Sequence, residues 1–286
     1  MNNGHCYNIT KKSISGQEKA FYTYIIGLSA FYIIFLIALI AADAVWLGKF
    51  AATASESQFT LFMESLFSKN TLHAVCLSFF TTTISTILAI LVGLPLTYFL
   101  SRWKFPGSAM IDTLIDMPIM LPPIVMGISL LVLLTSPFGR FLESMGIYFV
   151  FAIPGIILAQ FMVTCSFAVR TIKPVFDSLT RRYEDVAMTL GYTRSQAFMK
   201  TTLPMSKNAI LAAAVMCWAR ALGEFGPILI LVGYVEQDTS VMPTMIYMEN
   251  HVGKMEVALA VSVFMILLGF AAIFIFKRLG GGIRFS

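Results

Sequence analysis

Six long apolar stretches alternate with short polar segments along this chain of 286 residues. Each stretch is between 22 and 28 residues long, enough to cross about 30 Å of hydrocarbon at a helical rise of about 1.5 Å per residue. Apolar runs of this length indicate helices, because barrel strands span a membrane with about ten alternating residues. We therefore predict an all-α, polytopic membrane protein with six transmembrane helices, at Phe21–Leu47, His73–Leu100, Ile111–Leu134, Ile147–Val169, Asn208–Gly233 and Met255–Phe276.

The composition narrows the class of protein in the same direction. Hydrophobic residues make up 58% of the chain and charged residues 12%, against about 25% charged residues in soluble domains. This composition excludes a soluble enzyme, a secreted disulfide scaffold and a disordered regulator. The four cysteines and three histidines lack the spacing of a metal site, so we expect no metal.

The basic residues predict the orientation. Of the 20 Lys and Arg residues, 15 lie in segments on the side of the N-terminus, 4 lie in the opposite loops, and Arg220 lies within a span. Because positively charged loops face the cytoplasm, both terminal segments, 1–20 and 277–286, are predicted to be cytoplasmic. No block of Lys and Arg interleaved with aromatic residues is present, so we expect no nucleic acid as a partner. The apolar stretches indicate that the protein is surrounded by a lipid bilayer.

One predicted cytoplasmic loop, residues 170–207, is long and has a helical pattern. Apolar residues recur at helical spacing up to Leu190, and Gly191 can end that helix. Thr193 and Gln196 form a capping-box signature for a second short helix, which Pro204 is predicted to end. Two interpretations stay open for this helix pair: a hairpin on the lipid headgroups, or a docking surface for a soluble partner.

The loop also carries a recognisable motif. Residues 184–191 read E-D-V-A-M-T-L-G, nine residues follow, and residues 201–204 read T-T-L-P. This resembles the EAA loop of ABC importer permeases, E-A-A-x-x-x-G, nine residues and I-x-L-P, placed before the penultimate helix. The departures are Asp185 for Glu, Val186 for the first Ala and Thr201 for Ile. The resemblance covers residues 73–276, with the helix at 21–47 as an addition.

A second stretch narrows the resemblance. Residues 220–227 read R-A-L-G-E-F-G-P, and V-M-P-T follows at 241–244. This is similar to permeases for molybdate, tungstate and sulfate, and the molybdate and tungstate members are closer. The resemblance implies a homodimer of permease subunits in a prokaryotic cell membrane, with two cytoplasmic ATPase subunits and an external oxyanion-binding protein. Molybdate or tungstate is the first substrate that it implies, and sulfate is the second.

The resemblance also implies that this chain is no enzyme and holds no cofactor. No G-x-x-x-x-G-K-[ST] pattern occurs in the sequence, so ATP and Mg²⁺ would be used by the partner ATPase. The helix pair around Gly191 would dock on that ATPase, with Met188, Leu190 and Phe198 as apolar anchors and Glu184 and Arg194 at the rim. The residues assigned to coupling are Glu184, Asp185, Ala187, Met188, Leu190, Gly191, Arg194, Phe198, Leu203 and Pro204.

Ionisable residues inside the spans are candidates for a pathway, because each costs about 2.5–3.5 kcal/mol to insert. Arg220 and Glu224 are four residues apart and share a helix face. One interpretation is that they line a path or gate. The other, which we favour, is that they neutralise each other at a helix interface where Gly223 and Gly226 allow the helices to approach closely. The candidate pathway residues are Arg220, Gly223, Glu224, Gly226, Pro122 and Thr82.

Two further predictions concern the third span and the function class. Asp112 and Asp116 are assigned to the helix start or to contacts with Arg102 or Lys104, and the prolines at 118, 122 and 123 predict a kink. The alternative function is a proton-coupled secondary anion transporter or channel that uses Arg220 and Glu224. An intramembrane enzyme is excluded, since no Ser–His pair, facing Asp pair or metal constellation falls within the spans.

Overall fold

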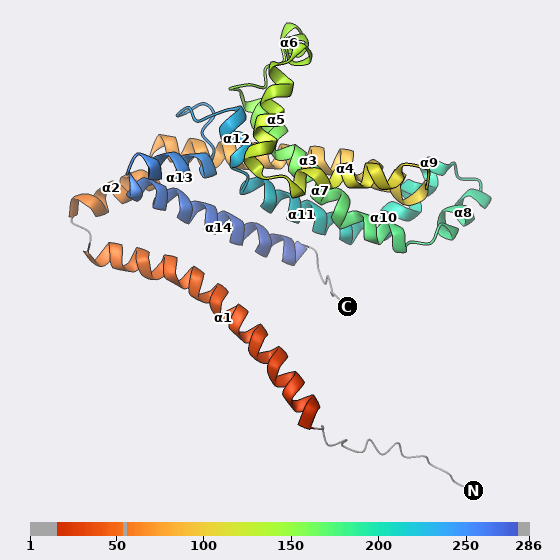
Figure 1. The fold of residues 1–286 in the computed structure, drawn as a ribbon, viewed down its shortest axis with the longest axis horizontal. Helices are drawn as coiled ribbons and strands as arrows, with labels where there is room; N and C mark the ends of the chain where they lie inside the picture. Colours follow the sequence, from red (N-terminus) through yellow and green to blue (C-terminus); the bar gives the residue numbers. More distant parts are fainter. Residues whose placement is uncertain (1–15, 54–55, 280–286) are drawn as a thin grey trace. The chain divides into compact units, whose positions relative to one another are not determined.

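The structure, a computed structural model, describes residues 16–53 and 56–279. Every regular element in these two ranges is helical (Figure 1), which confirms the all-α fold class. Of the predicted terminal segments, residues 1–15 and 280–286 lie outside the described residues. The elements are α1 (Gly16–Thr53), α2 (Glu56–Leu66), α3 (Lys69–Arg102), α4 (Ser108–Met120), α5 (Pro123–Thr135), α6 (Pro137–Ser144), α7 (Ile153–Ser178), α8 (Arg182–Thr189), α9 (Arg194–Ala197), the π-helix η1 (Phe198–Thr202), α10 (Leu203–Met205), α11 (Lys207–Leu222), α12 (Gly226–Leu231), α13 (Met242–His251) and α14 (Met255–Leu279).

The chain divides into two compact units, Met1–Thr60 and Leu61–Ser286, with the boundary inside α2. The first unit contains α1, whose apolar segment Phe21–Ala38 is long enough to cross a membrane. This helix agrees with the first predicted span. The second unit contains α3 to α14 and all of the candidate site residues.

The number of predicted spans is not confirmed. Among the described residues, four helices are long and apolar enough to cross a membrane, and the bent pair α4–α5 makes a fifth when counted as one span. This pair replaces the predicted third span: its two helices meet at an angle of 111°. Pro122 and Pro123 stand at the bend, where each lacks the N–H that would continue the helical ladder. The predicted kink is therefore confirmed.

The predicted fifth span is broken into two helices. α11 ends at Leu222, and α12 is only six residues long, from Gly226 to Leu231. Pro227 lies in the first turn of α12, where its missing N–H costs nothing. At the end of α11 the backbone oxygen of Ala221 accepts a hydrogen bond from Gln160 Nε2 at 3.2 Å. A polar side chain of α7 thus adds a hydrogen bond to a carbonyl that already accepts one from the Glu224 backbone N–H at 3.1 Å.

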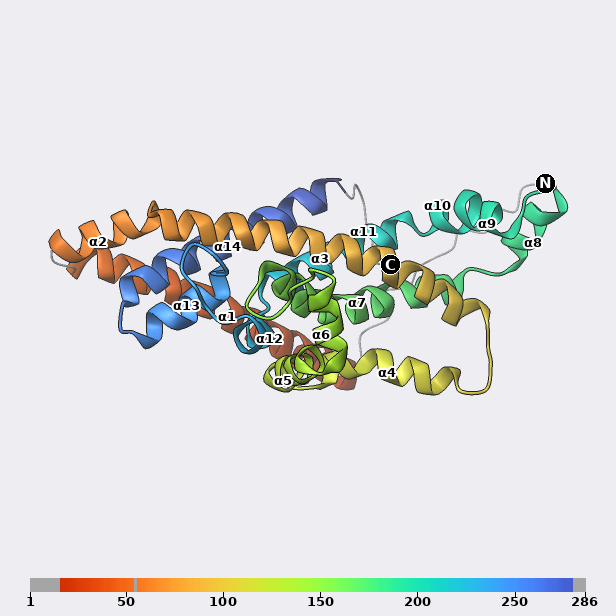
Figure 2. The ribbon, with the colours of Figure 1, turned by 90° about the horizontal axis from the view of Figure 1, so that it is seen from above.

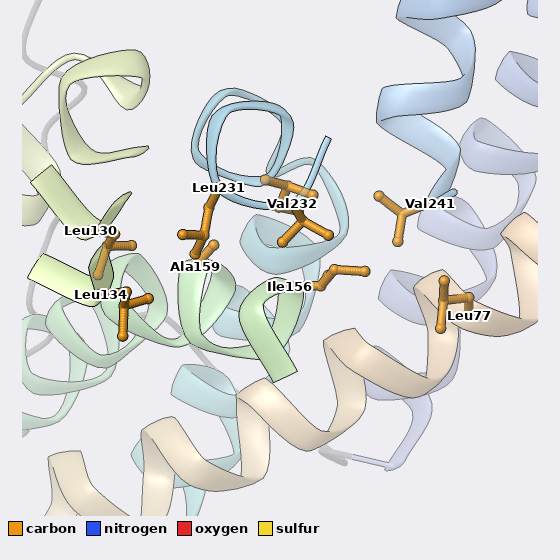
Figure 3. Packing of buried hydrophobic residues seen from close by; sticks show 9 residues of the cluster. Leu77, Leu130, Leu134, Ile156, Ala159, Leu231, Val232 and Val241 are labelled. Atoms are coloured by element: carbon orange, nitrogen blue, oxygen red, sulfur yellow. The ribbon is translucent and has the colours of Figure 1, made fainter. Parts of the chain in front are cut away.

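The core of the second unit is built around α3, α7 and α11. α3 packs along α7, and α11 packs against both of them, whereas α12 packs on α5 (Figure 2). One apolar cluster joins α3, α5, α7 and α12 (Figure 3): Leu77, Leu130, Leu134, Ile156, Ala159, Leu231, Val232 and Val241 are among its buried members. In Figures 1 and 2, α8 and α9 lie at one end of this unit and α13 lies at the other.

Two glycines of the broken helix provide a matched test of this packing. A Cβ at Gly226 would lie 2.9 Å from Pro123 Cβ and 3.3 Å from the Ile124 backbone nitrogen. A Cβ at Gly223 would have no neighbour closer than 3.9 Å. Because overpacking costs about 1–3 kcal/mol, we predict that Gly226→Ala lowers the melting temperature of the detergent-purified protein and that Gly223→Ala leaves it unchanged. Equal melting temperatures for the two variants would contradict the close contact between α5 and α12.

Candidate functional site

The loop after α7 folds as two short helices around Gly191, as predicted. α8 ends at Thr189, and Gly191 has a φ of +92°, a left-handed value that favours glycine. Thr193 Oγ1 accepts a hydrogen bond from the Gln196 backbone N–H at 3.3 Å, and Gln196 Oε1 accepts one from the Thr193 backbone N–H at 2.9 Å. The predicted capping box at the start of α9 is therefore present.

Both ends of this loop differ from the prediction. α7 continues to Ser178, so that the first residues of the predicted loop 170–207 belong to a membrane-length helix. Pro204 does not end the second helix, because the chain continues from α9 through η1 and α10 to a turn at Ser206. Proline is compatible with the first turn of a helix, and Pro204 occupies that position in α10.

A buried carboxylate lies at the base of the loop. The side chain of Glu184 is 8% exposed, and its Oε1 accepts hydrogen bonds from Arg102 Nη2 at 2.8 Å and Nε at 3.0 Å. Thr202 Oγ1 donates to the same oxygen at 2.6 Å, and Tyr98 Oη donates to Oε2 at 2.7 Å. Burial raises the pKa of the Glu184 carboxyl, but these hydrogen bonds outweigh burial and hold its pKa below the ordinary value. Glu184 is therefore ionised at neutral pH.

The opposite face of α8 is apolar and open. Tyr183 and Val186 are each 52% exposed and Leu190 is 74% exposed. Together with Tyr192 and Lys200 they line a groove of about 760 Å³. Residues three and four apart on a helix share a face. The helical spacing of apolar residues in this loop therefore reflects two faces, one that packs inside the protein and one that is exposed.

The predicted coupling residues differ in burial. Asp185, Leu190, Gly191, Arg194 and Pro204 are exposed; Met188 and Leu203 are partly buried; Ala187 is buried. Two of the assignments are corrected. Glu184 is not at a rim, since its carboxylate is the buried centre described above. Phe198 packs inside the chain, with its ring 4.5 Å from that of Tyr98 and 6.3 Å from that of Phe176.

The second candidate group lies at the break after α11. Arg220 Nη1 is 2.5 Å from Glu224 Oε2, and the Glu224 side chain is 2% exposed, against 33% for Arg220. The guanidinium also lies 5.9 Å from the centre of the Phe167 ring. The two charges therefore pair with each other, as favoured, while one third of the Arg220 side chain stays accessible. Gly226 is buried against Pro123, whereas Gly223 is exposed.

Thr82, a predicted pathway residue, lies in a polar network between α3 and α7. Thr82 is fully buried, and its Oγ1 lies 3.4 Å from Gln160 Nε2. Gln160 Oε1 accepts a hydrogen bond from Ser85 Oγ at 3.0 Å. These polar side chains satisfy one another between α3 and α7, because a buried polar group without a partner is costly. Pro122, in contrast, is exposed at the bend between α4 and α5.

The acidic pair of the third span has a different partner from the one predicted. Both Asp112 and Asp116 of α4 form ion pairs with Arg170 of α7. Arg102 is unavailable to them because it binds Glu184. The prediction placed these carboxylates at the helix start or beside Arg102 or Lys104, whereas the packing of α4 on α7 supplies Arg170.

Three side chains that surround Glu184 were not predicted from the sequence to lie there. Tyr98, Arg102 and Thr202 surround Glu184, and they come from α3 and η1. Their only signal in the sequence is an arginine at the end of a long apolar stretch. Such an arginine is typical of a membrane boundary, and so its buried partner was not predicted.

The overall fold is similar to one found among solved structures. It is similar to the solved structure of a bacterial ABC transporter involved in the import of the acidic polysaccharide alginate, with a TM-score of 0.73, 17% sequence identity, and coverage of 94% of this chain and 97% of that chain. The fold is thus one found in the membrane subunits of ABC importers. More particularly, residues 85–285 match the family of binding-protein-dependent transport system inner membrane components, and this chain belongs to that family.

Similar proteins are named for the transport of sulfate or of molybdate and tungstate. The sulfate transport system permease protein CysT of Salmonella typhimurium is 36% identical over 157 residues, which cover 54% of this chain and 57% of that protein. The molybdate/tungstate transport system permease protein WtpB of Thermococcus kodakarensis is 32% identical over 240 residues, covering 82% of this chain and 90% of that protein. The match to CysT therefore spans little more than half of either chain.

The ion pair at the break of α11 yields a stability prediction. Arg220→Met would leave the buried Glu224 carboxylate without its partner. We predict a loss of about 3 kcal/mol of unfolding free energy, the low end of the range for breaking a buried pair, because Arg220 is one third exposed. Arg220→Met combined with Glu224→Gln should recover most of this loss in thermal unfolding. No recovery in the double variant would contradict the pairing.

Proposed function

We propose that this chain is the membrane-spanning permease subunit of an ATP-driven importer that translocates an oxyanion. The observation that carries the proposal is the open apolar groove on α8, in a chain whose family is that of binding-protein-dependent transport systems. An exposed apolar surface framed by charged residues is typical of a protein–protein interface. On this proposal α8 and α9 face the cytoplasm, and both termini lie on that side.

The partner of the groove is a cytoplasmic ATPase subunit. Val186 and Leu190 supply the apolar contacts, and Arg182 and Lys200 border them. ATP and Mg²⁺ are bound and used by the ATPase, and its closure moves this loop and rocks the spans between inward-facing and outward-facing states. Two permease subunits form a homodimer around one path, with two ATPase subunits and one external binding protein.

The substrate class is a tetrahedral dianion. Relatives are named for sulfate and for molybdate or tungstate, and these anions share charge and shape. Molybdate or tungstate is our first assignment, on the resemblance of residues 220–227 and 241–244, although a relative named for sulfate covers as much of this chain. One third of the Arg220 side chain is accessible to a passing anion. Glu224 neutralises the charge of Arg220, and so the anion is not held tightly there.

The groove on α8 yields a binding prediction with a matched control. Val186→Asp places a charge in the groove, whereas Val252→Asp places one on an exposed valine that follows α13, at the other end of this unit. Since central interface residues contribute about 2 kcal/mol or more, we predict that Val186→Asp weakens ATPase binding by about 30-fold. Val252→Asp should bind the ATPase as the unmodified chain does. Equal binding by both variants would show that α8 is not the docking surface.

Transport itself is tested in proteoliposomes that contain the permease, the ATPase and the binding protein. We expect uptake of molybdate or tungstate that requires ATP and continues when a protonophore collapses the proton gradient. Uptake of sulfate alone would reassign the substrate within the oxyanion class. Uptake that stops with the proton gradient while ATP is maintained would contradict the proposal and support a proton-coupled transporter.

A further inference from the structure

We propose that Arg102 is a positioning residue for transport: through the buried Glu184 it joins the loop of α8, α9 and η1 to α3, so that movement of the loop is transmitted to the helix bundle. This inference rests on the proposed function. It assigns a role to a residue outside the coupling motif, at the end of the longest helix in the core.

The geometry of Arg102 suits a rigid joint. One edge of its guanidinium, Nε and Nη2, binds Glu184 Oε1. Its Nη1 donates to the backbone oxygens of Leu179 at 2.9 Å and Phe176 at 3.3 Å, at the end of α7. A planar guanidinium fixes the direction of several hydrogen bonds at once, which a lysine ammonium does not. The end of α3, the end of α7 and the start of α8 are therefore held by one side chain.

Few other contacts hold α8 to the bundle. α8 packs chiefly on α9 and η1, and η1 is continued by α10 and α11. Thr202 of η1 donates to the same Glu184 oxygen that Arg102 binds. The second tether is aromatic: Phe198 of η1 packs against Tyr98 of α3, whose hydroxyl also donates to Glu184. Arg194 of α9 also lies 5.7 Å from the Trp103 ring at the end of α3, and Phe198 packs on Phe176 of α7, so Glu184 is the shared hydrogen-bond partner among these contacts.

Burial separates this joint from the docking surface. The Glu184 side chain is 8% exposed and the Arg102 side chain 7%, so neither is accessible to an ATPase. The neighbouring Asp185 is exposed and occupies the first position of the EAA-like motif. Within α8, the Glu184 side chain therefore binds α3, whereas Val186, two residues further on, lines the docking groove.

The test replaces Arg102 with lysine, which keeps the charge and removes the fork. We expect Arg102→Lys to bind the ATPase and to hydrolyse ATP, but to move at least fivefold fewer oxyanions per ATP in proteoliposomes. In the permease alone, backbone amides of α8 and η1 should exchange hydrogen at least tenfold faster, while the central amides of α3 should be unchanged. Thr202→Val, a milder variant that removes one donor, should shift both readouts in the same direction.

The control is Lys173→Gln, which removes an ion pair within α7, to Asp177, next to the same end of α3. It should change neither readout.

The inference would be overturned if Arg102→Lys left unchanged both the ratio of oxyanion transported to ATP hydrolysed and the hydrogen exchange of the loop. Thr202→Val serves for the same comparison if Arg102→Lys does not fold. Absence of ATP-dependent uptake by the unmodified complex would instead overturn the proposed function, and the exchange experiment would still test the joint.

Discussion

The position of the helical loop depends on one buried charge. Removing the Glu184 carboxylate from water is costly unless donors replace the water, and four hydrogen bonds from three side chains do so. These donors come from α3 and η1, so satisfying the carboxylate brings the two ends of a long stretch of chain together. The outward face of α8 is then left free, and its apolar residues form the groove. A local electrostatic requirement thus decides which residues of the loop are available to a partner.

Broken helices are the second constraint on this fold. The bends at Pro122 and after Leu222 expose backbone groups inside a helical membrane protein, where irregular backbone is tolerated if protein covers it. Gln160 supplies a hydrogen bond to the end of α11, and the close contact of Gly226 with Pro123 brings α5 and α12 together. The Arg220–Glu224 pair lies at the same break. An ion pair and a side-chain hydrogen bond thus lie together where α11 ends.

Much of this architecture can be predicted from local patterns. The helix pair around Gly191 and its capping box depend on residues within a few positions of one another, and so does the bend at Pro122. Contacts between distant residues were harder to predict. Arg102 and Asp112 are near each other in sequence and opposite in charge, yet each has a partner on another helix. A helix of 16 residues after Pro204 was read as part of a longer span, because hydropathy does not register a break at Gly223.

The central claim is that the loop and α3 move as one body. It is tested most directly by the distance between two spin labels, one at Thr189, the last residue of α8, and one at Val92 on the exposed side of α3. The labels are attached in a variant that lacks the native cysteines. The label distance should be measured in the complete complex without nucleotide and with ATP bound. The account predicts the same narrow distribution in both states. A shift of several ångströms between the two states would show that the loop moves independently of α3 and would contradict the account.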